Sequence, residues 1–220
     1  MKKGVLISFE GMDKVGKSTQ VDRLIEHLRA NGIEPVAIRE PGSTEVSEKI
    51  RAILADRNMV GKISSLTEFF LYSASRAQLV VESIKPAMSK GEVIITDRYY
   101  DSSTAYQGYG RGLDLDFIID VNMKTTEGMV PDLTVLMVIE GSSIDSKEGV
   151  KRFGPDLFDD RLEREFIDFR TKVQNGYLTI AEKEPERFLV IDSSRTIAQI
   201  GKTIAARVDE LLKDRDRPQE

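Results

Sequence analysis

Short apolar runs alternate along the chain with longer segments that mix apolar and polar positions. Five runs are brief and rich in valine, isoleucine and leucine, as expected of strands buried on both faces; they are Val5–Phe9, Pro35–Ile38, Val93–Thr96, Leu133–Ile139 and Phe188–Ile191. The segments between them look helical; they are Ser18–Asn31, Thr44–Arg57, Leu66–Ser89, Leu115–Glu127, Leu162–Glu184 and Thr196–Lys213. This alternation predicts an α/β fold with a parallel sheet and right-handed crossovers.

No linker or internal repeat divides the sequence, so we expect residues 1–220 to form one domain. Two segments look irregular: Gly108–Gly112 is rich in glycine, and Gly141–Asp160 is long and polar. The second follows a strand that should end near a binding site, and a long loop in such a place is often a lid. We therefore expect a lid at about residues 141–161, with a tolerated surface insertion as the alternative. The charged tail, residues 214–220, is expected to fray.

The composition excludes several kinds of chemistry. The chain has 220 residues and no cysteine, which rules out disulfides, thiolate zinc sites and cysteine nucleophiles. Its only histidine, His27, lies in a predicted helix, where a surface or packing role is more common than catalysis. A net charge of −5 argues against a nucleic acid polymer as partner. No apolar stretch approaches a membrane span, and the N-terminal run resembles a buried strand more than a signal peptide, so we expect a cytoplasmic protein with no membrane partner.

The strongest motif runs from Gly11 to Ser18 and matches the phosphate-binding pattern G-x-x-x-x-G-K-[ST] in full. A predicted strand precedes it and a predicted helix follows it, so backbone N–H groups and the helix N-terminus can hold phosphates. Lys17 can reach the β- and γ-phosphates, and the Ser18 hydroxyl can coordinate Mg²⁺. The predicted nucleotide-binding residues are Gly11, Met12, Asp13, Lys14, Val15, Gly16, Lys17, Ser18 and Thr19. The motif alone does not separate a kinase from a GTPase or an ATPase, but the chain has no Asn-Lys-x-Asp guanine motif.

A second candidate lies at the end of the apolar run Val93–Thr96, which is followed directly by Asp97 and Arg98. In a parallel sheet the strand ends gather at the ligand crevice, so Asp97 should lie beside the phosphate loop. It could hold Mg²⁺ or position the group that accepts a phosphate. Arg98 would offer a two-pronged guanidinium to an anionic oxygen. The alternative is an ordinary surface ion pair.

Further segments resemble those of bacterial-type thymidylate kinases, of the P-loop nucleoside monophosphate kinase superfamily. They are Phe9–Asp13, Arg39–Gly42, Leu71–Arg76, Asp97–Tyr99 continuing through Asp101–Gly108, Pro131–Thr134 and Gly176–Leu178. Their shared order and spacing carry the resemblance over nearly the whole chain. It implies a P-loop NTPase fold with a five-stranded parallel sheet flanked by helices and a homodimer packed through helices.

The resemblance implies an acceptor pocket made of Glu40, Arg51, Tyr72, Arg76, Arg98, Ser103, Tyr106 and Gln107. Tyr72 would stack on the thymine ring, and Arg76, one helical turn later, would bind a base carbonyl. Ser103 and Gln107 would line the base edge. Tyr106 would lie under the sugar and favour deoxyribose.

The remaining implied contacts concern phosphate. Arg51 and Arg98 would clamp the acceptor phosphate, with Glu40 at the border of the pocket and Asp13 near the acceptor sugar or phosphate. Taken singly, Tyr72 could equally be a core aromatic and Arg51 a solvated helix residue.

The implied reaction is transfer of the γ-phosphate of ATP to dTMP, giving dTDP and ADP, with Mg²⁺, in dTTP synthesis. The residues expected to act in it are Lys17, Arg98, Asp97, Asp13 and the lid residue Arg161. Two other functions stay open: a P-loop kinase for another nucleoside monophosphate, and a non-catalytic nucleotide-binding protein or regulatory ATPase.

The sequence departs from the family pattern at three places. Many relatives carry Leu-Asp-Val in the fourth strand, where this chain has Met137 in place of the aspartate. The expected lid is longer and contains fewer arginines than in relatives. Lys14 stands where bacterial relatives often have a small residue, and we hypothesise that it shares the catalytic charge with the lid; a solvated lysine is the alternative.

Overall fold

The computed structural model describes residues 3–59, 61–139 and 160–215, without the side chains of residues 160–167. The expected lid at 141–161 therefore lies almost wholly outside the described residues, and so does the Arg161 side chain. Both stay predictions. Residues 214 and 215 of the expected tail belong to the last helix, which continues through Arg215; residues 216–220 lie outside the description.

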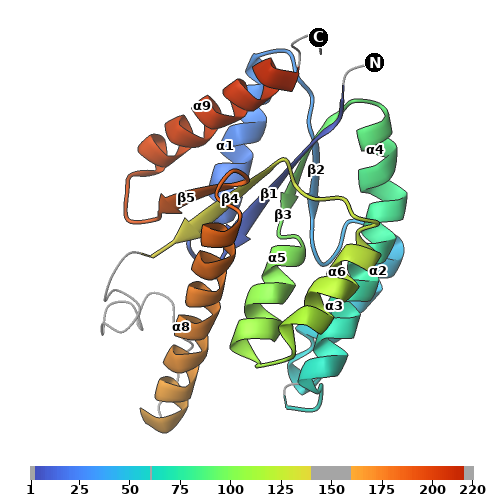
Figure 1. Cartoon of the computed structure of the whole chain (residues 1–220), viewed down its shortest axis with the longest axis vertical. Helices are drawn as coiled ribbons and strands as arrows, with labels where there is room; N and C mark the ends of the chain where they lie inside the picture. The colour runs from blue at the N-terminus through green and yellow to red at the C-terminus, as the bar shows by residue number, and fades with distance from the viewer. Residues whose placement is uncertain (1–2, 60, 140–159, 216–220) are drawn as a thin grey trace.

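The centre of the fold is a five-stranded parallel sheet with the strand order β2-β3-β1-β4-β5 (Figure 1). Its strands are β1 (Val5–Gly11), β2 (Val36–Arg39), β3 (Val93–Asp97), β4 (Leu133–Val138) and β5 (Phe188–Asp192). This confirms the α/β fold expected from the alternating pattern. Because all strands run the same way, the ends of β1, β2 and β3 meet at one edge, which brings the phosphate loop beside Asp97.

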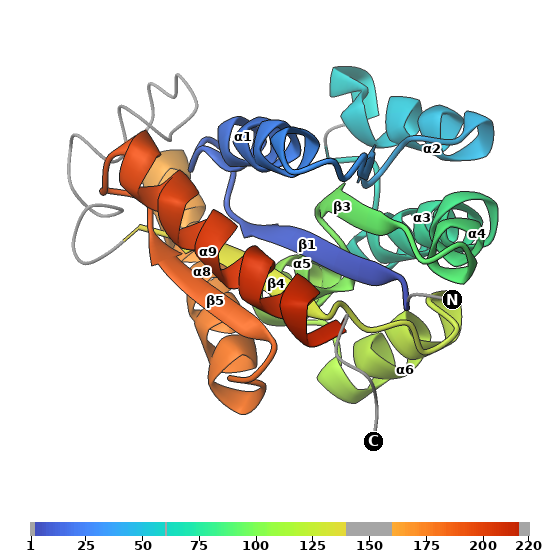
Figure 2. The same ribbon diagram turned by 90° about the horizontal axis from the view of Figure 1, so that it is seen from above.

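Helices cover the sheet and are α1 (Lys17–Ala30), α2 (Glu45–Ala55), α3 (Ser65–Leu79), α4 (Lys85–Ser89), α5 (Tyr100–Ser103), α6 (Leu115–Thr125), α8 (Asp160–Lys183) and α9 (Ile197–Arg215). Helices α1 and α9 lie side by side (Figures 1 and 2). There, Ile7 of the central strand packs in one cluster with Leu24 and Ile204. The neighbouring residue Leu6 points the other way and packs with Ile84. The alternation of strand side chains thus divides the core between the two faces of the sheet.

The expected helix Leu66–Ser89 is continuous but changes its winding. Between α3 and α4 lies a π-helical turn, η2 (Val80–Ile84), in which the Lys85 N–H bonds to the Val80 carbonyl. Pro86 follows directly and has no N–H to return to the preceding turn. The wider turn therefore precedes a residue that cannot continue the regular α-helical ladder.

The expectation of an irregular segment at Gly108–Gly112 is wrong for its first three residues. Helix α5 continues as a π-helical stretch, η3 (Thr104–Gly110), and only residues 111–112 leave it. A Cβ on Gly108 would lie 2.6 Å from Leu115 Cδ2, and one on Gly110 would lie 2.7 Å from Phe169 Cε2. The glycines therefore permit close packing against α6 and α8, rather than a turn.

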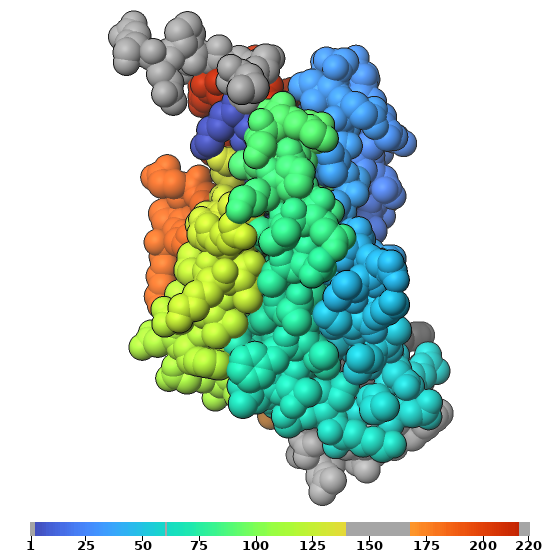
Figure 3. All heavy atoms as spheres, turned by 90° about the vertical axis from the view of Figure 1, so that its right-hand side faces the viewer, coloured from blue at the N-terminus to red at the C-terminus, as the bar shows by residue number. Residues whose placement is uncertain are grey.

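Helices α2, α3 and α6 form one outer face of the molecule (Figure 3). Large apolar side chains are exposed on these helices and include Val46, Ile53, Leu66, Phe70 and Phe117. Within the described part of the chain, no helix combines the length and the apolarity needed to cross a membrane.

Candidate active site

The phosphate loop joins β1 to α1 and needs unusual backbone angles. Gly11 has a φ of +126° and Gly16 a φ of +96°, and Lys14 also lies in the left-handed region at +65°. A Cβ on Gly11 would lie 2.2 Å from the Met137 carbonyl oxygen. Only glycine therefore allows the loop to leave the sheet this close to β4.

Lys17 lies at the start of α1 and is almost completely buried, at 7% exposure. Its ammonium donates hydrogen bonds to the carbonyl oxygens of Gly11 (3.1 Å) and Met12 (2.8 Å), so the loop wraps around it. Burial, with the nearby charge of Arg98, lowers the pKa of Lys17 to about 8. The ammonium is thus held, still mostly charged at neutral pH, where nucleotide phosphates would approach.

Asp97 and Ser18 lie together, as the sheet order requires. The Ser18 hydroxyl donates to Asp97 Oδ2 at 3.3 Å. The other carboxylate oxygen, Oδ1, is buried and has no hydrogen-bond partner among the described residues. A hydroxyl and a carboxylate oxygen suit Mg²⁺, which takes few protein ligands and completes its shell with water and phosphate. The pair therefore fits the metal that the sequence predicted.

A cavity of about 390 Å³ opens over the phosphate loop. Its lining gathers predicted nucleotide-binding residues and several charged neighbours, namely Asp13, Lys14, Gly16, Lys17, Ser18, Thr19, Arg39, Glu40, Arg51, Asp97 and Arg98. Met12 and Val15 instead pack into the core beneath the loop. Arg51 lies here, with its Nη1 donating to the Pro41 carbonyl at 2.9 Å, and not in the pocket with the other residues assigned to the acceptor.

A second cavity of about 260 Å³ adjoins the first. All the residues predicted for the acceptor, apart from Arg51, line it. The complete lining is Asp13, Glu40, Glu68, Tyr72, Arg76, Arg98, Ser102, Ser103, Tyr106, Gln107, Arg111 and Phe169. Sequence reasoning missed Glu68, Ser102, Arg111 and Phe169, because each resembles an ordinary helix-surface or core position in isolation.

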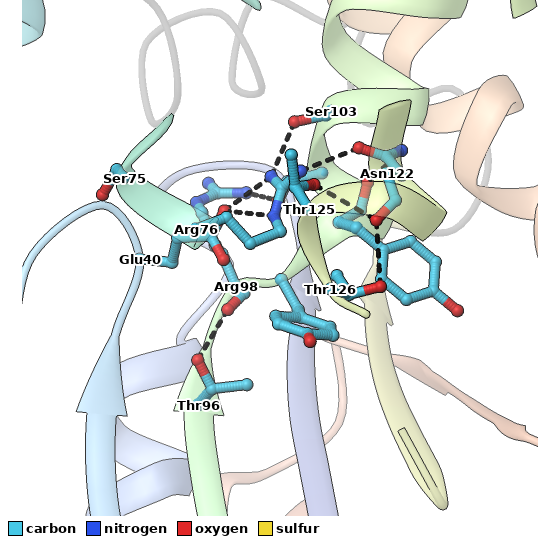
Figure 4. Close-up of polar contacts among 12 residues, drawn as sticks. Glu40, Ser75, Arg76, Thr96, Arg98, Ser103, Asn122, Thr125 and Thr126 are labelled. Atoms are coloured by element: carbon cyan, nitrogen blue, oxygen red, sulfur yellow. Dashed lines mark hydrogen bonds and ion pairs between the residues drawn. The ribbon is translucent and has the colours of Figure 1, made fainter. Parts of the chain in front are cut away.

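Arg76 is fully buried and lines this cavity; Figure 4 shows its polar contacts. Its Nε donates to Glu40 Oε1 at 2.8 Å, Nη1 to Asn122 Oδ1 at 2.7 Å and Nη2 to Ser103 Oγ at 2.7 Å. Burial raises the pKa of Glu40, although the charge of Arg76 acts against this. These contacts from three separate elements fix the guanidinium in one orientation.

Arg98 lies between the two cavities and has a φ of +73°, which is uncommon for a residue with a side chain. The Thr96 hydroxyl donates to its carbonyl at 2.7 Å (Figure 4). Its Nη2 forms an ion pair with Asp13 at 2.6 Å, and its Nη1 donates to the Gly11 carbonyl at 3.0 Å. Burial alone would raise the pKa of Asp13, but the adjacent Arg98 lowers that pKa below its ordinary value.

Glu10 is a buried carboxyl that sequence reasoning left without a role. It accepts hydrogen bonds from the Tyr99 N–H (2.7 Å), the Ser102 hydroxyl (2.6 Å) and the Tyr177 hydroxyl (2.8 Å). Burial, and then the charge of Asp101, raise the pKa of Glu10 to about 7. The available signal was an acidic residue at the end of an apolar strand, directly before the phosphate loop.

Met137 occupies the position where the family often has an aspartate. Met137 is buried. Its backbone carbonyl lies against Gly11, and the terminal methyl of its side chain lies near Gly16. Its side chain thus supports the phosphate loop from behind by apolar contact.

Comparisons with known proteins identify the family of this chain. The family model for thymidylate kinase matches residues 9–204. The thymidylate kinase of Caldanaerobacter subterraneus subsp. tengcongensis is 45% identical over 212 residues, covering 96% of this chain and 98% of the relative. That of Thermoanaerobacter sp. strain X514 is 43% identical over 210 residues, covering 96% and 100%. The crystal structure of thymidylate kinase from Ehrlichia chaffeensis superposes with a TM-score of 0.72 at 29% identity, covering 94% of this chain and 99% of that one. The chain belongs to the thymidylate kinase family.

Proposed function

We propose that this protein transfers the γ-phosphate of ATP to dTMP, giving dTDP and ADP, as a step in dTTP synthesis. The observation that carries the proposal is the pair of adjoining cavities, one over the phosphate loop and one containing an aromatic ring and a buried arginine. Asp13, Glu40 and Arg98 line both cavities. A donor phosphate in the first and an acceptor phosphate in the second would meet at this shared wall.

On the donor side, the loop amides, the α1 N-terminus and Lys17 bind the phosphates of ATP. Ser18 and Asp97 would hold Mg²⁺, which supplies charge neutralisation at the phosphoryl group being transferred. The unpartnered Oδ1 of Asp97 supports this assignment.

On the acceptor side, Tyr72 stacks on the thymine and Arg76 donates to a base carbonyl. Tyr106 lies under the sugar, where its ring packs edge-on against Phe169 and Tyr177. Arg98 binds the acceptor phosphate, and Arg51 approaches the same phosphate from the donor side.

The reaction needs positioning more than proton transfer. The dTMP phosphate is already an anionic nucleophile near neutral pH, and its repulsion by the ATP phosphates is the main obstacle. Lys17, Arg98 and the loop amides oppose that repulsion and hold the reacting groups in line.

The exposed apolar side chains on α2, α3 and α6 support a homodimer formed through this face (Figure 3). Two of them, Phe70 and Phe117, lie together with ring centroids 6.1 Å apart, and exposed apolar patches mark interaction surfaces. Sedimentation analysis of the wild type and of Phe70→Glu tests this, with the variant expected to be monomeric.

The activity is tested by measuring ADP release from Mg-ATP with a panel of dTMP, dUMP, UMP, dCMP, AMP and GMP. ADP formation that depends on dTMP and yields dTDP supports the proposal. Release with another monophosphate alone would keep the kinase chemistry but overturn the acceptor assignment. A folded, ATP-binding protein without acceptor-dependent release would indicate a binding or regulatory role.

A further inference from the structure

Glu68 is a cavity residue that belongs neither to the phosphate loop nor to the residues for which the family resemblance implied a role. It lies on α3, one helical turn before Tyr72, and lines the acceptor cavity. Its Oε1 accepts a hydrogen bond from Gln107 Nε2 at 2.9 Å. Arg111, whose guanidinium stacks over the Phe169 ring, donates to the same carboxylate at 3.3 and 3.4 Å.

The contact between Glu68 and Gln107 fixes which end of the Gln107 amide faces the ligand. An ionised carboxylate only accepts hydrogen bonds, so the amide must present its NH₂ group to Glu68. The opposite end, Oε1, then points away from Glu68, and it accepts no hydrogen bond from any other described residue. The flipped amide would occupy the same space but would place its oxygen against the Glu68 carboxylate oxygen, and this repulsion disfavours it.

The cavity that the Gln107 amide lines also contains a fixed donor, Arg76. Gln107 is one helical turn beyond Ser103, and the Ser103 hydroxyl accepts from Arg76 Nη2 at 2.7 Å. Arg76 and Gln107 both line this cavity, which therefore contains both a guanidinium donor and an amide carbonyl acceptor. Thymine offers the complementary pair, a carbonyl oxygen next to a ring N–H. At the same positions cytosine offers an amino group, which donates, and a bare ring nitrogen, which accepts, so both hydrogen-bond roles are reversed.

We propose that Glu68 is a positioning residue for base selection, which holds the Gln107 amide with its oxygen toward the ring N–H of the acceptor base. This rests on the proposed function, because it assumes that the second cavity binds dTMP. A site that hydrogen-bonds one base edge rejects the reversed edge, since its buried polar groups would then be left unpaired.

The test compares the wild type with Glu68→Ala, using kcat/KM for dTMP and dCMP at saturating Mg-ATP. If dCMP turnover is too slow to measure, the inhibition constant of dCMP in competition with dTMP is used in place of its kcat/KM. We expect KM for dTMP to rise about fivefold to tenfold and the preference for dTMP over dCMP to fall by a similar factor, with KM for ATP unchanged. Glu127→Ala removes a carboxylate that pairs with Lys85 on the surface, and serves as the matched control.

Glu68→Met keeps the apolar stem of the side chain and tests the same expectation if Glu68→Ala folds poorly. The decisive comparison adds Gln107→Ala and the double variant. If Glu68 acts through the amide, Glu68→Ala changes the base preference in the wild type but not in the Gln107→Ala background. An unchanged preference in both Glu68 variants, or an equal change in both backgrounds, would overturn the proposal. Failure of the wild type to phosphorylate dTMP would instead contradict the proposed function itself.

Discussion

The Tyr177 hydroxyl donates a 2.8 Å hydrogen bond to the buried carboxylate of Glu10, and so ties helix α8 to the strand that enters the phosphate loop. Arg98 Nη1 donates to this hydroxyl at 3.3 Å and to the Ser102 hydroxyl at 3.0 Å, and both hydroxyls contact Glu10. The Glu10 carboxyl is thereby linked, through two hydroxyls, to the guanidinium between the cavities. This network stabilises Arg98 in its strained backbone conformation.

Glu10 should make stability depend on pH. Its pKa is raised from 4.5 to about 7 in the folded protein, so between these values the folded state holds a proton that the unfolded state has released. The contribution of Glu10 to the free energy of unfolding is fully present below pH 4.5. It is lost as pH rises toward 7, and the loss is on the order of 3 kcal/mol. The free energy of unfolding of Glu10→Gln, measured by urea denaturation from pH 5 to 8, should therefore rise relative to the wild type. Glu26→Gln, on the surface of α1, is the control, and a constant difference for Glu10→Gln would contradict the prediction.

Lys17 should be needed for turnover and not for folding. Replacement by methionine removes the buried ammonium, and we expect kcat for ADP formation to fall about 10²- to 10³-fold. The thermal midpoint should change little, because burial already disfavours the charged form. Lys202→Met, at an exposed position of α9, should keep wild-type activity. A kcat within a few fold of the wild type would remove Lys17 from the mechanism.

Lys14 provides a separate test of charge at the phosphate loop. Glycine suits its positive φ, so Lys14→Gly removes the charge without adding backbone strain. If Lys14 shares the catalytic charge, kcat should fall at least about fivefold, which corresponds to ~1 kcal/mol of transition-state stabilisation. Lys14→Arg should retain most of the activity. An unchanged turnover number for Lys14→Gly would mean that this lysine is simply solvated.

Gly110 should tolerate no side chain. A Cβ there would lie 2.7 Å from Phe169 Cε2 and 2.8 Å from Val173 Cγ2, both on α8. Gly110→Ala should lower the free energy of unfolding by about 1–3 kcal/mol through overpacking. At Gly201 a Cβ would lie 2.9 Å from Nε of the exposed Arg23 side chain and 3.2 Å from Oε1 of the buried Gln20, so Gly201→Ala should cost less stability than Gly110→Ala. Equal stability of the two variants in urea would disprove the close packing.

The sequence predicted the strands well because their signal is local. Each apolar run begins and ends within two residues of its strand in the structure. The central strands β1, β3 and β4 are buried on both faces, which demands continuous apolar character, whereas the edge strands β2 and β5 are partly exposed. The stretch Thr104–Gly110 was missed for the opposite reason. Its glycines resemble turn residues in isolation, and only the approach of Leu115 and Phe169 shows why glycine is needed inside a helix.

In the candidate site, too, local sequence signals could be predicted and contacts between distant residues could not. The phosphate loop could be predicted because eight consecutive residues carry its chemistry. Glu10 and Glu68 could not, because their partners Tyr177 and Gln107 lie far away in the chain. A lone carboxylate is most often solvated, and only the three-dimensional contacts overturn that expectation.

The wall shared by the two cavities couples the affinities of the two substrates. Asp13 and Arg98 form an ion pair across this wall, so an anion arriving in either cavity competes for the same guanidinium. If bound dTMP changes the dissociation constant of ATP by some factor, bound ATP must change the dissociation constant of dTMP by the same factor. This holds because both binding orders lead to the same ternary complex. An anion that binds Arg98 from either cavity would thus make each substrate an effector of the other.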